Sequence, residues 1–268
     1  MPTATFRDNA VILTGASSGI GRALALQLAA QGAWLALAAR DVDRLAEVER
    51  QCRSLGGRAI TIPTDVSDES QCRNLVDCAV KDFGRLDTLI NNAGISMWAR
   101  FDEMETLAPF EEMMRVNYLG AVYCTHYALP HLKRRGGRLV AVSSLAGRNG
   151  VPTRSGYAGS KHAMVGFFDS LRIELSGSGV SVTIVYPDFV TSEIRERAYG
   201  RDGRPLGKSP VREAEVMSAE ECARLIVDAA GKRKRELLMG RGPIGIWLKM
   251  LAPKLADNIA RKAIATGK

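Results

Sequence analysis

Several features that mark specialised classes of protein are missing from this sequence. Its five cysteines are an odd number, have no C-x-x-C spacing and fall in segments with a helical pattern. Neither a disulfide framework nor a zinc site is therefore indicated. No apolar run reaches the ~18 residues of a membrane span, and the N-terminal MPTATFRDNAVILTG lacks the cationic and apolar segments of a signal peptide. We expect a globular cytoplasmic protein that holds no metal.

Acidic residues are scarce at the C-terminal end of the chain. The 268 residues carry a formal net charge of +8 at pH 7. Residues 232–268 hold ten lysines and arginines against two acids, so this segment accounts for the whole excess and the rest of the chain is neutral. No stacking aromatics or nucleic-acid-binding motif accompany these basic residues, and we expect no nucleic acid as a partner.

Short apolar runs rich in β-branched residues alternate with amphipathic stretches along most of the chain. The runs are VILTG, WLALAAR, RAITIPTD, LDTLINNAG, GRLVAVSS, VSVTIVYP and ELLMG. Between them apolar residues recur at helical spacing, for example over residues 22–31 and 44–55. Strands that alternate with helices imply parallel strands joined by right-handed crossovers. The sequence therefore predicts an α/β fold, a doubly wound Rossmann-type parallel sheet of about seven strands with helices on both faces.

We expect residues 1–240 to form one dinucleotide-binding and catalytic domain. Within it, residues 188–217 are rich in Arg, Glu, Gly, Ser and Pro and show little hydrophobic periodicity. A long loop in a compact domain is usually functional, which suggests a lid-like loop over a site. Residues 241–268 are expected to form a basic amphipathic C-terminal extension. Such a segment fits packing over the pocket or against another subunit, and also peripheral contact with an anionic membrane surface.

The first predicted strand is followed by the glycine-rich stretch GASSGIG and an amphipathic helix. Glycine permits a tight turn and lets the backbone approach a pyrophosphate, which N–H groups at a helix N-terminus then bind. The spacing of Gly15, Gly19 and Gly21 is G-x-x-x-G-x-G, which differs from G-x-G-x-x-G. Such a turn can also be purely structural, but its place after the first strand of an alternating pattern favours nucleotide binding.

The predicted second strand, WLALAA, ends at Arg40. In a site that prefers NAD, an acid near this position binds the ribose 2′-hydroxyl, whereas an arginine accommodates the 2′-phosphate of NADP. Arg40 could instead be a solvated residue that opens the next helix, and Asp41 could repel a phosphate. Asp41 also has a structural role as the cap of that helix. Arg40 therefore favours NADP (NADPH) as cofactor, with NAD as the alternative.

The stretch YAGSK places Tyr157 and Lys161 four residues apart in a predicted helix that begins near Ser155. Positions i and i+4 lie on one helix face, so the lysine ammonium can approach the phenol oxygen. A neighbouring positive charge favours the phenolate form and makes the tyrosine a proton donor and acceptor. Taken alone, Y-x-x-x-K is also common on solvated helix faces.

The motifs TGASSGIG, NNAG, VNYLG, VSS and YAGSK follow one another along the chain. In order and separation they resemble the short-chain dehydrogenase/reductase superfamily, in its compact single-domain branch, from Val11 to about Gly240. The resemblance implies that Tyr157 is the catalytic acid/base. It also implies that Lys161 assists this tyrosine and holds the nicotinamide ribose.

The resemblance implies roles for further polar residues. Ser144 would hydrogen-bond the substrate oxygen, with Ser143 as the weaker candidate, and Asn117 would hold a water of the proton relay. Asp65 and Val66 resemble the pair that contacts adenine. The expected cofactor contacts are Gly15, Ser17, Ser18, Gly19, Ile20, Gly21, Arg40, Asp65, Val66, Asn91, Ala93, Gly94, Tyr157, Lys161, Pro187, Val190 and Thr191.

One position departs from the family's pattern. The family usually has Pro-Gly after the sixth strand, whereas here Pro187 is followed by Asp188. Glycine there allows close approach to the nicotinamide, so a carboxylate could alter the fit of the cofactor or place a charge near the substrate. It could equally point into solvent.

The residues expected around the substrate are Ser96, Trp98, Leu145 and Phe189, a mostly apolar set, although Trp98 could simply pack under the lid. The predicted function is that of an NADP(H)-dependent oxidoreductase, a carbonyl reductase or alcohol dehydrogenase acting on a hydrophobic small molecule. One alternative is a non-catalytic dinucleotide-sensing or scaffold protein on the same fold. Another is a sugar-nucleotide epimerase or dehydratase, for which the chain is short. By resemblance, a homodimer or homotetramer is expected.

Overall fold

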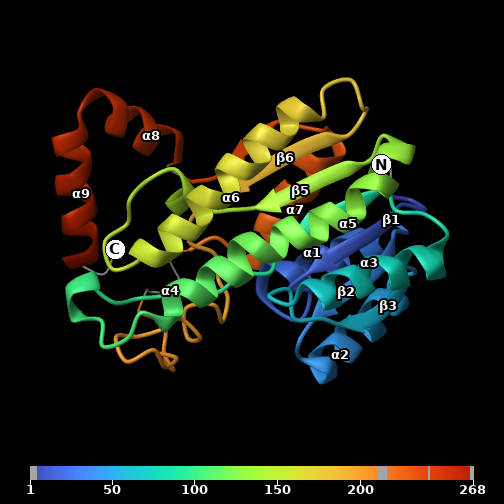
Figure 1. Cartoon of the computed structure of the whole chain (residues 1–268), viewed down its shortest axis with the longest axis horizontal. Coiled ribbons are helices and arrows are strands. Elements are labelled where there is room, and N and C mark those ends of the chain that lie inside the picture. Colours follow the sequence, from blue (N-terminus) through green and yellow to red (C-terminus); the bar gives the residue numbers. More distant parts are fainter. Residues whose placement is uncertain (1–4, 211–215, 241, 266–268) are drawn as a thin grey trace.

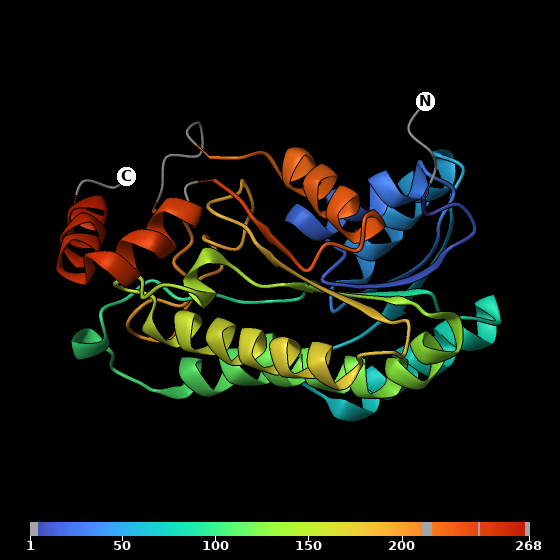
Figure 2. The ribbon, with the colours of Figure 1, turned by 90° about the horizontal axis from the view of Figure 1, so that it is seen from above.

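A parallel β-sheet runs through the centre of the molecule, with helices packed on both faces (Figures 1 and 2). The structure, a computed structural model, describes residues 5–210, 216–240 and 242–265. Within these ranges the sheet has seven strands in the order β3-β2-β1-β4-β5-β6-β7. The strands are β1 (Ala10–Thr14), β2 (Trp34–Ala39), β3 (Arg58–Pro63), β4 (Thr88–Asn91), β5 (Arg138–Val142), β6 (Ser181–Tyr186) and β7 (Glu236–Leu238). The predicted doubly wound fold is confirmed.

Both faces of the sheet are buried because alternate strand residues point to opposite sides. In β1, Val11 and Leu13 join the core formed with α1, α2 and α7. Ala10 and Ile12 join the core formed with α3, α5 and α6 on the other face, and Figure 2 shows these layers edge-on. The helices of the main body are α1 (Gly19–Ala29), α2 (Val42–Ser54), α3 (Glu69–Phe83), α4 (Ala108–Met113), α5 (Gly120–Arg135), α6 (Ser155–Glu174) and α7 (Ala219–Gly231).

Local sequence signals fix where several helices begin and end. The side chain of Asp41 accepts a hydrogen bond from the backbone N–H of Arg44 (3.1 Å), so its predicted role as the cap of α2 is confirmed. Asp68 caps α3 in the same way through Ser70 (2.8 Å). Helix α3 ends at Gly84, which has a φ of 72°, a left-handed conformation that favours glycine.

The long segment between β6 and α7, here named the β6–α7 loop, spans residues 188–217, of which 211–215 lie outside the described residues. Its described part consists of turns and isolated bridges and contains no helix. Tyr199 forms a bridge to Met97 and Val190 forms one to Met217. These contacts tie the loop to the segment after β4 and draw its two ends together.

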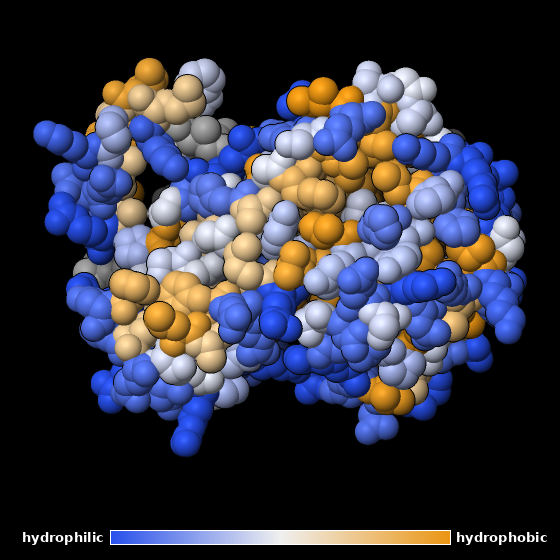
Figure 3. Space-filling model, in the orientation of Figure 1, coloured by the Kyte–Doolittle hydropathy of each residue, from blue (hydrophilic) through white to orange (hydrophobic). Residues whose placement is uncertain are grey.

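The C-terminal extension forms helices α8 (Gly242–Leu251) and α9 (Pro253–Ala265), which lie beside the N-terminal end of α6 (Figure 1). A hydrogen bond from Lys249 Nζ to the carbonyl oxygen of Arg148 (3.1 Å) holds α8 to the body. In Figure 3, apolar residues lie on the surface of the two helices α8 and α9 at the end of the molecule. Exposed apolar side chains in these helices are Trp247, Met250, Leu251, Leu255 and Ile259. Contact with a subunit or a membrane stays a prediction, and residues 241 and 266–268 lie outside the described residues.

The described ranges contain no helix that is both long and apolar enough to cross a lipid bilayer. They also contain no cluster of His, Cys, Asp and Glu that could hold a metal ion. The five cysteines lie in helices, as the sequence predicted, and are free thiols. Burial raises the pKa of Cys52 and Cys222 to about 12, so these thiols stay protonated and unreactive at neutral pH.

Candidate active site

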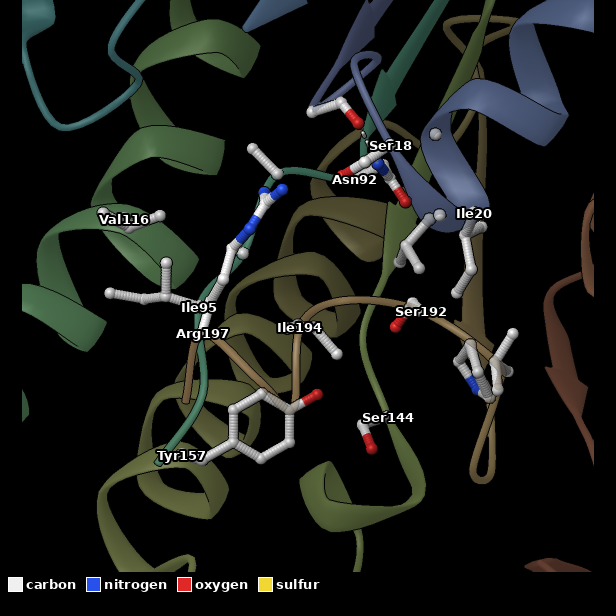
Figure 4. Close-up of a pocket in the computed structure, with 18 of the residues that line it drawn as sticks. Ser18, Ile20, Asn92, Ile95, Val116, Ser144, Tyr157, Ser192, Ile194 and Arg197 are labelled. Carbon is white, nitrogen blue, oxygen red and sulfur yellow. Dashed lines mark hydrogen bonds between the residues drawn. The ribbon is translucent and has the colours of Figure 1, made fainter. Parts of the chain in front are cut away.

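A cavity of about 490 Å³ opens at the carboxyl ends of the central strands. Residues that follow β1 to β6 contribute to its wall, and Figure 4 shows them converging on this space. From β1 the chain moves outward through β2 and β3, and from β4 it moves outward the other way through β5, β6 and β7. Doubly wound sheets bind ligands at such a switch point, outside the carboxyl ends of their strands.

Backbone packing shapes the glycine-rich turn between β1 and α1. Gly15 and Gly19 have φ values of 66° and 51°, which other residues rarely adopt. A Cβ added to Gly21 would lie 1.9 Å from the carbonyl oxygen of Gly15, and one added to Gly15 would lie 2.9 Å from the Cα of Ala93. Side chains are excluded at these positions by the fold itself, which leaves backbone at the surface of the cavity.

The NNAG segment after β4 braces this turn. Asn92 Nδ2 donates to the carbonyl oxygens of Thr14 (2.9 Å) and Gly15 (3.2 Å). In return, Thr14 Oγ1 accepts the backbone N–H groups of Asn92 and Ala93, each at 3.0 Å. The two loops at the switch point are therefore one hydrogen-bonded unit, which holds the glycine turn in position before any ligand binds.

The N-terminal end of α1 fits a pyrophosphate. Ser18 stands at the N-cap position without a side-chain hydrogen bond to the helix, and the first turn of α1 has no acidic residue. The orphan N–H groups of this end and the helix dipole favour an anion. Ser17, Ser18, Gly19 and Ile20 all line the cavity, so this end of the cleft suits the phosphates of a dinucleotide.

Arg40 and Asp65, at the ends of β2 and β3, form the rim of the cavity on the side where the sequence predicts the adenosine. Arg40 Nη1 lies 3.8 Å from Asp65 Oδ2, and the arginine side chain is 64% exposed. The same aspartate accepts hydrogen bonds from the backbone N–H (2.9 Å) and the hydroxyl (2.7 Å) of Ser67. Among the described residues, Arg40 forms one long, solvated ion pair, which leaves its guanidinium available to a ligand.

Tyr157 and Lys161 lie on one face of α6, which begins at Ser155 as predicted. The Tyr157 ring is 6% exposed, and Lys161 Nζ lies 5.9 Å from its centre. Lys161 is fully buried and donates to the carbonyl oxygen of Val142 (2.9 Å). Burial lowers the pKa of this lysine below its usual value, and the nearby Tyr157 opposes the shift.

The two serines after β5 have different environments. Ser144 lies in the cavity wall, and its Oγ accepts a hydrogen bond from the backbone N–H of Ala146 (3.2 Å), which leaves its own proton to be donated to a ligand. Ser143 is 3% exposed, and its hydroxyl points to the carbonyl oxygen of Lys161 (3.4 Å). In Figure 4 the hydroxyl of Tyr157 faces the side of the pocket that carries Ser144.

Asn117 stands in a π-helical turn, Met114–Leu119, between α4 and α5. Its Oδ1 accepts from the backbone N–H of Ile95 (2.8 Å), and its Nδ2 donates to the Ile95 carbonyl oxygen (3.0 Å) and to Ser160 Oγ (2.9 Å). Such π-helical insertions often occur at functional sites. Here the insertion lets one buried side chain join the segment after β4 to Ser160 of α6.

The β6–α7 loop closes the cleft from the opposite side. A Cβ added to Gly19 would lie 3.0 Å from the Cβ of Ser192, so the loop reaches the glycine turn. Glu193 Oε2 accepts from Arg44 Nη1 of α2 at 2.6 Å, and Tyr199 and neighbouring loop residues line the cavity. The predicted lid segment therefore spans both the nucleotide and the substrate ends of the cleft, as Figure 4 shows for Ser192, Ile194 and Arg197.

Asp188 is half-buried in the cavity wall and does not simply point into solvent. Its Oδ1 accepts from the backbone N–H of Phe189 at 2.9 Å. Its Oδ2 lies 2.6 Å from the position of a Cβ added to Gly240. The carboxylate therefore packs against the end of β7.

Five residues that the sequence assigned to cofactor, catalysis or substrate lie behind or beside the cavity wall: Asn91, Ser96, Trp98, Asn117 and Thr191. Asn91 is buried in β4, where its Nδ2 donates to Thr125 Oγ1 (3.0 Å), so the next residue, Asn92, faces the cleft in its place. Ser96 and Trp98 both contact Arg154 behind the wall. Thr191 is exposed, and its backbone N–H donates to Met217 (2.9 Å).

The other predicted residues line the cavity, together with several that sequence reasoning missed. The missed residues include Asn92, Arg154, Ser192, Ile194, Arg195 and Arg197. Asn92 could have been found from the alternation of side chains along β4. The loop arginines and Arg154 gave no signal, because arginine in a polar segment usually reads as a solvated side chain.

Comparison with known proteins agrees with this geometry. The family model described as short chain dehydrogenase matches residues 9–201. The chain is similar to 11-beta-hydroxysteroid dehydrogenase 1A of Arabidopsis thaliana, with 40% identity over 265 residues that cover 96% of this chain and 76% of that protein. It is also similar to a dehydrogenase/reductase SDR family protein 7-like of Dictyostelium discoideum, with 31% identity over 97% of this chain and 83% of that one.

Among solved structures, a short chain dehydrogenase/reductase from Burkholderia phymatum in complex with NAD has the same architecture. It matches with a TM-score of 0.83 at 26% identity and covers 94% of this chain and 96% of its own. The fold, the glycine turn braced by NNAG and the buried Tyr157–Lys161 face agree with the family that was inferred from the motifs. The chain belongs to the short-chain dehydrogenase/reductase family of oxidoreductases.

Proposed function

We propose that the protein is an NADP(H)-dependent oxidoreductase of hydrophobic carbonyl compounds and the matching secondary alcohols, with Tyr157 as general acid and base. The observation that carries this proposal is the buried grouping of Tyr157 and Lys161 opposite Ser144, at the end of a cleft whose other end suits a dinucleotide. When bound, the nicotinamide supplies or accepts the hydride.

The protein's own residues supply the proton and the positioning. In reduction, Tyr157 gives its hydroxyl proton to the substrate oxygen, and Ser144 donates a hydrogen bond to the same oxygen as negative charge develops on it. Lys161 holds positive charge near the phenolate that remains. Asn117 fixes the segment after β4 against α6, and we propose that this region passes the proton to and from solvent.

Two contacts support NADP over NAD. Arg40 projects from the end of β2 with its guanidinium mostly exposed, which suits bidentate hydrogen bonds to a 2′-phosphate. Asp41, which would repel a phosphate, is turned to α2 and lies 3.3 Å from Arg44 Nε, so its charge is balanced locally. The NAD in the Burkholderia phymatum structure belongs to that protein, and nucleotide preference has to be measured on this chain.

Apolar residues at the substrate end support a hydrophobic substrate. Leu145, Ala146, Val151 and Phe189 line this part of the cavity. The names of the similar plant proteins make hydroxysteroids a sensible first class to test beside simple ketones and aldehydes. A cytoplasmic location and a homo-oligomeric state remain predictions from the sequence.

The proposal is tested by following NADPH oxidation at 340 nm against ketones, aldehydes and oxosteroids, with NADH in parallel. Tyr157→Phe is expected to lower kcat by roughly 10²- to 10⁴-fold, the range that general acid–base catalysis supplies, while nucleotide binding persists. Tyr127→Phe is the matched control, because Tyr127 lies outside the cavity and its hydroxyl donates a hydrogen bond to Glu69 on the surface. Turnover that survives in Tyr157→Phe would remove Tyr157 from the mechanism. Tight NADPH binding without turnover of any substrate would favour a sensor protein.

A further inference from the structure

Arg154 is a buried cation that the chemistry above does not use. It precedes α6 by one residue, is 8% exposed and lies in the cavity wall. Its guanidinium carbon stands 4.5 Å from the ring centre of Tyr157, nearer than Lys161 Nζ at 5.9 Å. A permanent positive charge is therefore held next to the residue that handles the proton.

Three aromatic rings surround this guanidinium. Besides Tyr157, its central carbon lies 5.4 Å from the ring of Trp98 and 5.7 Å from the ring of Phe189. The three rings come from the segment after β4, from α6 and from the β6–α7 loop. Cation–π contacts of this kind offset only part of the cost of burying a charge.

The hydrogen-bond donors of the Arg154 guanidinium are only partly used within the described residues. Arg154 Nη2 donates to Ser96 Oγ at 2.9 Å, but its Nε–H finds no hydrogen-bond partner among the described residues. In the part of the chain that the structure describes, no carboxylate forms an ion pair with Arg154, whereas the nearby Arg148 pairs with Glu236. Burial lowers the pKa of Arg154, the nearby Tyr157 opposes this shift, and the charge of Arg195 adds to it. A guanidinium nevertheless stays charged at neutral pH.

We infer that Arg154 binds a carboxylate of the substrate, so that preferred substrates are apolar carbonyl compounds bearing an acidic group a few bonds from the reacting carbon. This rests on the proposed function, because it assumes that the carbonyl lies at Tyr157. A carboxylate matches the planar donor fork of an arginine and supplies the charge that the cage of rings lacks. Because the guanidinium carbon lies 4.5 Å from the centre of the ring that carries the reacting hydroxyl, the acid and the carbonyl are expected to be separated by only a few bonds.

The inference is tested with α- and γ-keto acids that end in a phenyl group and with their methyl esters, which keep the carbonyl and lose the charge. We expect the wild-type protein to have a KM for the acid at least tenfold below that for the ester. Arg154→Met should raise the KM for the acid by roughly 10- to 100-fold, the worth of a hydrogen bond to a charged group, and leave that for the ester nearly unchanged. Arg154→Lys keeps the positive charge but lacks the planar pair of donors of the guanidinium. Its KM for the acid should lie between those of the wild-type protein and Arg154→Met.

Arg201→Met serves as the matched control, because Arg201, in the β6–α7 loop, pairs with Glu105 on the surface (3.2 Å) and does not line the cavity. If Arg154→Met lowers kcat equally for acid and ester, Arg154 positions Tyr157 and the inference is wrong. An equal KM for acid and ester in the wild-type protein would also overturn it.

A binding measurement separates this inference from the proposed function and does not require a folded variant. Phenylbutyrate, which has a carboxylate and no ketone, should raise the melting temperature of the wild-type protein with NADPH present, and phenylbutyramide should not. That result would support the carboxylate site even if no ketone is turned over. Equal effects of the two compounds would overturn the inference while leaving the oxidoreductase proposal standing.

Discussion

The proposed nucleotide half and substrate half of the cleft differ in whether backbone or side chains form their walls. The phosphate end of the nucleotide half is formed by backbone, with Gly15, Gly19 and Gly21 packed so closely that no side chain fits. The substrate half consists of side chains from the segment after β4, from α6 and from the β6–α7 loop. These side chains surround Arg154, and the loop covers them. The nucleotide half suits a constant ligand, whereas the substrate half can change its specificity by exchanging side chains without disturbing the sheet.

The strongest test of this contrast is a single methyl group in the nucleotide half. Gly21→Ala places a Cβ 1.9 Å from the Gly15 carbonyl oxygen and 2.7 Å from Asn92 Nδ2, and these two atoms are already hydrogen-bonded to each other. We expect a loss of about 3 kcal/mol or more of folding stability together with loss of nucleotide binding. Chemical denaturation and NADPH fluorescence titration measure the two effects.

Gly166→Ala is the control, because Gly166 is also helical but has no neighbouring atom within 4 Å of an added Cβ. Helix propensity alone would make both substitutions stabilising by up to ~1 kcal/mol. If Gly21→Ala lowers the folding stability while Gly166→Ala raises it, close packing around Gly21 determines the effect of the substitution. If Gly21→Ala is as stable as wild type and binds NADPH, the nucleotide half is less rigid than its contacts imply.

The same contrast explains which site residues could be predicted from the sequence and which could not. The glycine turn, Arg40 and the Tyr157–Lys161 pair follow from local spacing, since each depends on one strand end or one helix face. Trp98 and Thr191 depend on how long loops fold, and the structure places both beside the cavity wall. Arg154 could not be found, because its burial arises from three segments that are far apart in the chain.

The next largest effect is expected at Lys161, where the two halves of the cleft meet. Lys161→Met should lower kcat by about 10²- to 10⁴-fold, since it removes the charge beside Tyr157. The same change should raise thermal stability at neutral pH. Burial lowers the pKa of Lys161, so the folded protein binds this proton less tightly than the unfolded chain, whose lysine has the ordinary value of 10.5.

The pH dependence of that gain follows from the direction of the shift. The cost of the buried charge is fully present below the folded pKa and fades as pH rises from there towards the unfolded value. The stability advantage of Lys161→Met should therefore shrink as the solution becomes alkaline, as melting curves across a pH series would show. Lys133→Met, at an exposed site at the end of α5, should show no such trend. An advantage that grows with pH would contradict the assignment.

The smallest of these effects belongs to Arg40, which acts in the nucleotide half through an exposed side chain. Arg40→Ala should weaken NADPH binding by roughly 10- to 100-fold, because a charge-assisted bond to the 2′-phosphate is lost. NADH binding should stay within about twofold, since NADH has no phosphate there and the backbone contacts that hold the pyrophosphate are untouched. Arg50→Ala is the control, because Arg50 pairs with Glu47 on the surface of α2 outside the cavity. Equal weakening of both nucleotides would mean that Arg40 supports the fold of the rim through Asp65 instead of reading the phosphate.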